Sequence, residues 1–199
     1  MLLYIVRTFI KPFYDGLYGR DSKNLTQKTL TTTIPNSSKS VNTSSTSNTK
    51  EMAEQKGEQF EKFIVNKFDM TFFKVVEWRG DKYSNGHFPE SNKYPDLEMM
   101  LNADGKKHFF AVECKYRSTL NSIPPIDHVQ LRNYEQFQEM KGIPVFIAIG
   151  TGGTPSAPSS LYIIPLHYYL ANKWNPYKLE AFLKKGERFF YDHKTKRLK

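Results

Sequence analysis

The segment from His108 to Tyr116 constrains the fold of this chain more than any other part of it. It is apolar on both faces, which is typical of a strand buried inside a sheet, until Glu113 and Lys115 interrupt it. Residues two apart on a strand point to the same face, so these two charges lie side by side. Burying either charge alone would be expensive, so the pair indicates a special environment at this strand end.

A second strand is expected over residues 96–101, and the turn-forming run 102–107 joins it to the first as a hairpin. This pairing would bring Asp96 close to Glu113 and Lys115. Two carboxylates suit Mg²⁺, which proteins usually hold with one or two carboxylates, waters and a substrate phosphate. Lys115 would then orient or deprotonate an attacking water. The alternative is an ordinary solvated Glu113–Lys115 pair, against which the apolar run before Glu113 and the Pro95-Asp96 dipeptide upstream both argue.

A helix is expected before the strands, because apolar residues recur there at helical spacing. Glu61 falls at the edge of this apolar arc, whereas Glu58 lies farther out. A carboxylate at the rim of a buried stripe suggests a cation partner, so Glu61 is the preferred site acid. A salt-bridged glutamate at the helix boundary is the alternative. The arc consists of Ala53, Phe60, Phe63, Ile64 and Phe68.

A second helix follows the strands, and Gln130 lies in the middle of its apolar face with Tyr134 one turn away. A buried amide needs hydrogen-bond partners, so Gln130 either bonds to backbone in the core or faces the site. The Glu113–Lys115 strand immediately before this helix favours the site. The apolar neighbours of Gln130 are Ile126, Leu131, Tyr134, Phe137 and Met140.

The motifs Pro95-Asp96 and Glu113-Cys114-Lys115 resemble those of the PD-(D/E)XK nuclease superfamily, which has the restriction-endonuclease-like fold. Residues 57–61 are similar to the acidic motif of that family's first helix, and residues 130–134 to its Q-x-x-x-Y element. The resemblance covers residues 51–170. It implies that Asp96, Glu113 and the backbone carbonyl of Cys114 bind Mg²⁺, or Mn²⁺ as a substitute. It also implies that Lys115 serves the water, with Glu61 and Gln130 as supporting groups.

The expected fold is therefore α/β, a restriction-endonuclease-like mixed sheet flanked by helices in the order α-β-β-β-α-β-β. The first strand is expected over residues 71–78 and the last two over 143–150 and 161–164.

Composition divides the chain near residue 50. Fifteen of the twenty residues from 31 to 50 are Ser, Thr or Asn, which predicts a disordered linker within a non-core extension, residues 1–50. Residues 51–199 then form one nuclease-like domain with a basic C-terminal tail. Met52 directly precedes the first convincing helix, which raises the hypothesis that translation starts there.

The chain carries 29 Lys and Arg against 20 Asp and Glu, and residues 173–199 hold nine of these bases against three acids. This basic end would contact phosphates, or would merely aid solubility. DNA is the expected partner. The residues expected to contact it are Lys82, Lys93, Arg117, Arg132 and Tyr134.

A single cysteine, Cys114, excludes an intramolecular disulfide and fits a reducing compartment, so a cytoplasmic location is expected. Cys114 alternates to the face opposite Glu113 and is expected in the core. The apolar start, residues 1–10, is too short to span a bilayer, and no stable membrane insertion is expected.

The leading expectation is a Mg²⁺-dependent nuclease that acts on DNA. The sequence does not determine the oligomeric state, and a homodimer is one of the options. The alternatives are a catalytically inactive nucleic-acid-binding module of the same fold, and a structural or interaction protein whose charges form surface pairs.

Overall fold

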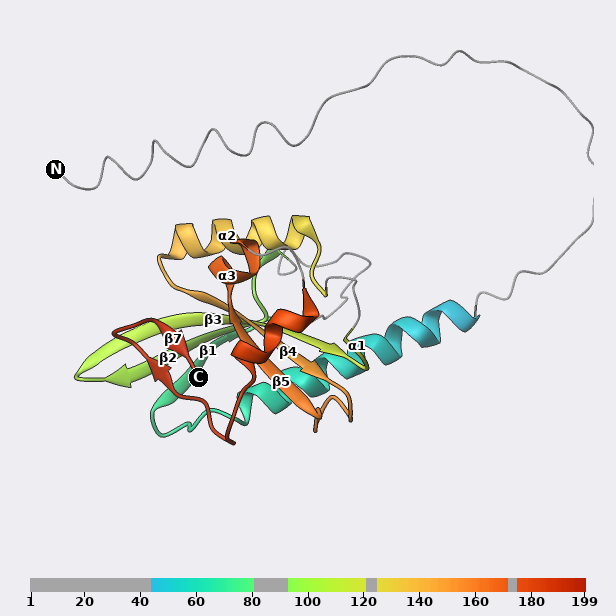
Figure 1. The fold of residues 1–199 in the computed structure, drawn as a ribbon, viewed down its shortest axis with the longest axis horizontal. Helices are drawn as coiled ribbons and strands as arrows, with labels where there is room; N and C mark the ends of the chain where they lie inside the picture. Colours follow the sequence, from blue (N-terminus) through green and yellow to red (C-terminus); the bar gives the residue numbers. More distant parts are fainter. Residues whose placement is uncertain (1–43, 81–92, 121–124, 172–174) are drawn as a thin grey trace, which may run out of the picture. The chain divides into compact units, whose positions relative to one another are not determined.

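The apolar runs of the sequence form the strands of a five-stranded sheet in the computed structural model, which describes residues 44–80, 93–120, 125–171 and 175–199 (Figure 1). Side chains are described from residue 51 onward. The strands lie in the order of the chain, β1-β2-β3-β4-β5. Their bounds are β1 (Phe73–Trp78), β2 (Leu97–Ala103), β3 (Lys106–Arg117), β4 (Val145–Thr151) and β5 (Ser160–Pro165).

The sheet is mixed, because β3 and β4 pair in parallel whereas the other neighbours pair antiparallel. A parallel pair needs a crossover, and helix α2 (His128–Lys141) provides it. The tight β2–β3 turn uses Asp104 and Gly105, both with positive φ (51° and 69°), as a two-residue hairpin of the favoured handedness requires. In β1 the register shifts between Val75 and Glu77, which leaves Val76 as the extra residue of a bulge.

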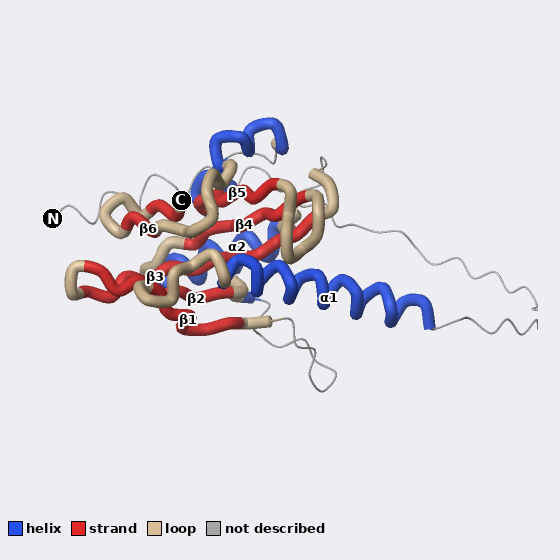
Figure 2. The backbone as a smooth tube through the Cα atoms, turned by 90° about the horizontal axis from the view of Figure 1, so that it is seen from below, coloured by secondary structure: helices blue, strands red, loops and turns tan. Residues whose placement is uncertain are grey.

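Helices cover both faces of this sheet, as Figures 1 and 2 show together. Helix α1 (Ser44–Val65) runs along one face and α2 along the other. The chain continues after β5 through α3 (Leu166–Ala171), the 3-10 helix η3 (Pro176–Phe182) and a hairpin of β6 (Tyr191–Asp192) and β7 (Arg197–Leu198). The order of elements and the five-stranded mixed sheet confirm the predicted fold class.

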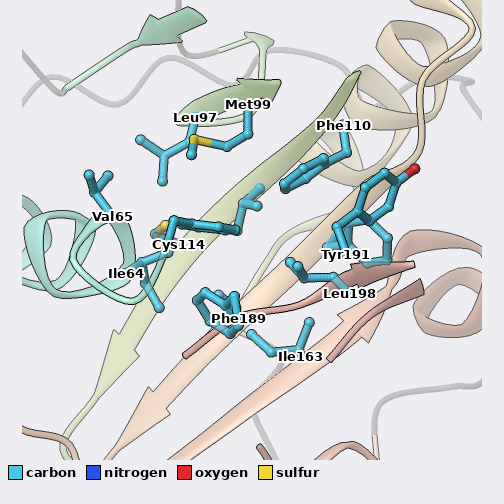
Figure 3. Packing of buried hydrophobic residues seen from close by; sticks show 14 of the residues in the cluster. Ile64, Val65, Leu97, Met99, Phe110, Cys114, Ile163, Phe189, Tyr191 and Leu198 are labelled. Carbon is cyan, nitrogen blue, oxygen red and sulfur yellow. The ribbon is translucent and has the colours of Figure 1, made fainter. Parts of the chain in front are cut away.

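Two hydrophobic clusters hold these layers together, one on each face. Beneath α1, the ring of Phe68 contacts those of Phe73, Phe110 and Phe189, with centroids 4.8–5.8 Å apart. Figure 3 shows Phe189, Tyr191 and Leu198 entering this cluster from the C-terminal segment. The other cluster packs α2, α3 and η3 against the opposite face through Ala111, Leu131, Phe137, Ile147, Ile149, Leu166 and Leu179.

The C-terminal segment differs from the predicted tail, because it is folded onto the core. Tyr191 and Leu198 are buried, so removing the residues after Arg188 would remove core side chains as well as charges. The two strands of this hairpin have two residues each, too few to show a strand period in the sequence.

Three smaller differences concern the helices. Helix α1 begins at Ser44, inside the stretch predicted as linker, since extending an existing helix needs no new nucleus. Ala53 is exposed, and so is Met140, which was predicted on the apolar face of α2. Because three residues advance a helix by about 300°, the series Leu131, Tyr134, Phe137 turns steadily and Met140 ends on the solvent side.

None of the helices in the described residues is long and apolar enough to cross a membrane.

Candidate active site

The β2–β3 hairpin brings Asp96 to the end of β3, as the sequence predicts. Leu97 pairs with Val112, so Asp96, one residue earlier, lies level with the end of the apolar run. Its Oδ2 accepts a hydrogen bond of 2.7 Å from the backbone N–H of Cys114. The carboxylate is thereby fixed against the backbone between Glu113 and Lys115.

Glu113 and Lys115 form an ion pair inside this site. The Lys115 Nζ lies 2.5 Å from Oε1 of Glu113, and the glutamate is almost fully buried. The second oxygen of Glu113, Oε2, is buried and accepts no well-formed hydrogen bond from a described residue, although the Tyr134 hydroxyl lies near this carboxylate. An unsatisfied buried acceptor costs free energy, so this oxygen is a candidate ligand for a cation.

The carboxylates of Asp96, Glu113 and Glu61 repel one another. Burial raises the pKa of Asp96 well above its ordinary value, and the negative charges of Glu113 and Glu61 raise it further. Lys115 and the Cys114 amide lower it by a smaller amount. Burial also raises the pKa of the Cys114 thiol, which stays neutral and packs in the core as predicted. A cation bound here would relieve the repulsion among the carboxylates.

Glu61 joins the site from α1, and Glu58 does not. Glu61 is 4% exposed and accepts a hydrogen bond of 2.5 Å at Oε2 from the indole Nε1–H of Trp78. The Glu58 side chain is 58% exposed and pairs with Lys62 along the helix surface. The helical periodicity therefore separated the buried acid from the solvated one.

Helix α2 contributes Tyr134 from the other face of the sheet. Asp127 caps the helix by accepting hydrogen bonds of 2.8 Å from the N–H groups of Val129 and Gln130. Tyr134 is 1% exposed, and burial together with the charges of Glu113 and Asp96 raises the pKa of its hydroxyl above the ordinary value. The hydroxyl therefore stays protonated beside the carboxylates. Gln130 is half-buried one turn earlier on the same helix.

The residues expected to contact DNA lie at different depths in the structure. Tyr134 is 1% exposed and its ring packs in the hydrophobic cluster beneath α2. Arg117 donates 2.7–2.8 Å hydrogen bonds to the carbonyls of Tyr116 and Pro125, which ties the end of β3 to the segment before α2. Lys93 and Arg132 are exposed, and Lys82 lies outside the described residues.

Sequence reasoning missed two residues at the end of β1. Trp78, the hydrogen-bond donor to Glu61, was expected only as the last residue of the first strand, and Arg79 was not expected in the site. Arg79 is instead a buried cation, with its guanidinium 3.2 Å from the buried carboxylate of Glu98. The only signal in the sequence is a tryptophan followed by an arginine where the strand ends.

The donor set fits Mg²⁺ better than zinc. Across the described residues, no group of three or more His, Cys, Asp or Glu side chains could hold a metal ion on its own. A zinc site would require three or four such ligands, whereas Mg²⁺ is commonly held by one or two carboxylates and keeps several waters. Asp96 and Glu113 supply two neighbouring buried carboxylates of the kind that Mg²⁺ uses.

Comparison with known proteins adds a distant similarity to solved structures. No protein-family model and no curated protein matches this chain. Among solved structures, it is similar to Hjc, a Holliday junction resolvase from the archaeal hyperthermophile Archaeoglobus fulgidus, with 17% identity and a TM-score of 0.38. The match covers 56% of this chain and 74% of that one. The assignment of the fold therefore rests on the strand order and pairing of this chain.

Proposed function

We propose that this protein is a divalent-metal-dependent nuclease that hydrolyses phosphodiester bonds in DNA. The observation that supports it best is Glu113, which shares one oxygen with Lys115 while the other is buried near Asp96 and Tyr134 without a well-formed hydrogen bond. Clustered buried acids are unfavourable for folding, and strongly perturbed carboxyls of this kind are characteristic of functional sites.

Asp96, Glu113 and the backbone carbonyl of Cys114 would hold the metal. Bound Mg²⁺ would supply positive charge to the phosphate oxygens and favour ionisation of a water. Mn²⁺ prefers the same oxygen ligands and would substitute for it.

Lys115 would orient the attacking water or, as the neutral amine, take its proton. The Lys115 ammonium is anchored on Glu113, yet its side chain is partly exposed and so reaches solvent. The protonated hydroxyl of Tyr134 lies near Glu113 and would orient that carboxylate. Glu61 would accept a hydrogen bond from water, and Gln130 would assist at the rim.

Cleavage assays on supercoiled plasmid, linear duplex, single-stranded DNA and a four-way junction test this proposal, each with Mg²⁺, Mn²⁺ or EDTA. Lys115→Ala should slow cleavage by about 10²–10⁴-fold, the usual contribution of a group that transfers a proton. Lys107→Ala is a matched control, because Lys107 is exposed at the opposite end of β3. Glu58→Gln is the control for Glu61→Gln. Wild-type rates in Lys115→Ala would show that the assignment is wrong.

Metal binding separates the proposal from a purely structural role. A ligand that binds only the folded state adds RT ln(1 + [L]/Kd) to stability, about 1.4 kcal/mol at ten times Kd. Mg²⁺ or Mn²⁺ should therefore raise the melting temperature of wild type, and Asp96→Asn should abolish the rise. A metal shift without cleavage of any substrate would indicate an inactive nucleic-acid-binding module.

A further inference from the structure

Trp78 and Arg79 are neighbours at the end of β1, and they reach opposite faces of the sheet. Successive residues of a strand alternate between its two faces. The indole of Trp78 reaches α1, where it donates its 2.5 Å hydrogen bond to Glu61. The guanidinium of Arg79 reaches the α2 face, where it lies 5.5 Å from the ring centroid of Phe137.

Arg79 holds the main-chain carbonyls of both Pro95 and Asp96. Its guanidinium donates a hydrogen bond of 3.0 Å to the carbonyl of Pro95. Its backbone N–H donates one of 2.7 Å to the carbonyl of Asp96. Asp96 lies one residue before β2 and is not part of that strand. These two hydrogen bonds therefore hold its main chain in place.

The Arg79 side chain is itself immobilised. Its side chain is 7% exposed and contacts the carboxylates of Glu77 and Glu98, of which Glu98 also has Lys141 at 3.5 Å. A planar guanidinium can serve two carboxylates and a carbonyl at once, whereas an ammonium on a flexible stem cannot hold the same geometry. A buried ion pair offsets its desolvation only when the geometry is good, so this arrangement indicates a fixed position.

We propose that Trp78 and Arg79 act as a positioning pair that sets Glu61 and Asp96 in one site from the two faces of the sheet. This role rests on the proposed nuclease function. Neither residue would contact the reacting phosphate. Each would act through the acid that it holds, so its loss would affect the chemical step more than DNA binding.

Trp78→Phe and Arg79→Lys are the test variants. Trp78→Phe keeps an aromatic ring but removes the indole N–H. Arg79→Lys keeps the positive charge beside Glu98 but removes the planar guanidinium with its several N–H donors. Each should lower kcat by about ten- to a hundredfold, the effect of losing a hydrogen bond to a charged group. KM should stay within about twofold, because ground-state binding is unchanged. The controls are Tyr177→Phe and Lys74→Arg, both at exposed positions.

A KM effect would contradict the proposal. Trp78 is 39% exposed, so a ring that stacks on a base would raise KM in Trp78→Phe and leave kcat unchanged. Wild-type kcat and KM in both variants would also overturn the positioning role, while the nuclease proposal itself would stand.

A readout without DNA tests the same pair even if wild type cleaves nothing. Glu61→Gln should shift the indole N–H resonance of Trp78, which the Trp78→Phe variant assigns because that resonance is missing from its spectrum. Arg79→Lys should raise the Mn²⁺ concentration needed for half of the thermal shift by about tenfold, because Asp96 is less well held. An unmoved indole resonance with unchanged Mn²⁺ dependence would refute the pair on structural grounds alone.

Discussion

Gly150→Ala provides a stringent test of how α1 is placed over the sheet. A Cβ at Gly150 in β4 would lie 2.3 Å from Cε2 and 2.8 Å from Cζ of Phe60. Carbon atoms pack at about 3.5–4.0 Å, so the ring would have to move by more than about 1 Å. Phe60 is fully buried between Phe63 and Tyr116, with ring centroids 6.0 Å away on each side. The helix would therefore move with its ring.

The expected cost is that of overpacking a core, about 1–3 kcal/mol. For a domain of this size the melting temperature would fall by about 2–4 °C for each kcal/mol. Activity should fall further than stability suggests, because Glu61 is the next residue along α1. A displacement of about 1 Å at a site can lower the rate about a hundredfold.

Urea unfolding and plasmid cleavage would be measured on the same preparations. Gly57→Ala is the control, since Gly57 lies on the same helix with nothing within 4 Å of an added Cβ, and it should be neutral or slightly stabilising. Phe60→Leu should relieve the clash, so the double variant Gly150→Ala/Phe60→Leu should lose less stability than the two single losses added together. Strict additivity, or a Gly150→Ala protein within about 0.5 kcal/mol of wild type, would refute the reasoning.

Three further predictions follow from the site and the core. Burial and neighbouring acids raise the pKa of Asp96 in the folded state, so the folded protein binds that proton more tightly than the unfolded chain does. Metal-free stability should therefore fall as pH rises from about 4, the unfolded value, toward the raised pKa, and urea unfolding in EDTA should show a flatter profile for Asp96→Asn. Leu198→Ala should lower the free energy of unfolding by about 2–4 kcal/mol, because Leu198 is buried, whereas Lys199→Gln should leave it unchanged. If the basic C-terminal segment contacts phosphates, Lys199→Gln should also reduce the slope of log K for DNA against log[salt] by about 0.7–0.9. Asp127→Ala removes the cap of α2 and should destabilise the protein by about 1 kcal/mol in thermal melts, with a loss of activity through Tyr134.

The sequence predicted those parts of the site that depend on local geometry. The β2–β3 hairpin follows from a short turn between two apolar runs, and its register then places Asp96 beside Glu113 without further information. Helical spacing alone distinguished Glu61 from Glu58, because burial on an amphipathic helix repeats with its period.

The parts that the sequence did not predict depend on contacts between distant segments. The bond from Trp78 to Glu61 joins residues 17 apart, and the one from Arg79 to the Pro95 carbonyl joins residues 16 apart. No periodic pattern encodes either contact, since each depends on where a single side chain ends in the assembled fold. The C-terminal hairpin was not predicted for a related reason. Its many basic residues dominate the sequence there, and its few buried residues, Tyr191 and Leu198, form no periodic pattern.

The C-terminal segment also protects an edge of the sheet. The edge strands are β1 and β5, and an open edge offers unpaired N–H and C=O groups to another chain. Along β5, Leu183 bridges to Tyr162 and the N–H of Lys184 donates a 2.7 Å hydrogen bond to the carbonyl of Leu161. Along β1, the bulge at Val76 interrupts the regular spacing that a docking strand would need. We therefore expect a chain shortened before Leu183 to aggregate through β5 rather than through β1, which light scattering at rising protein concentration would detect.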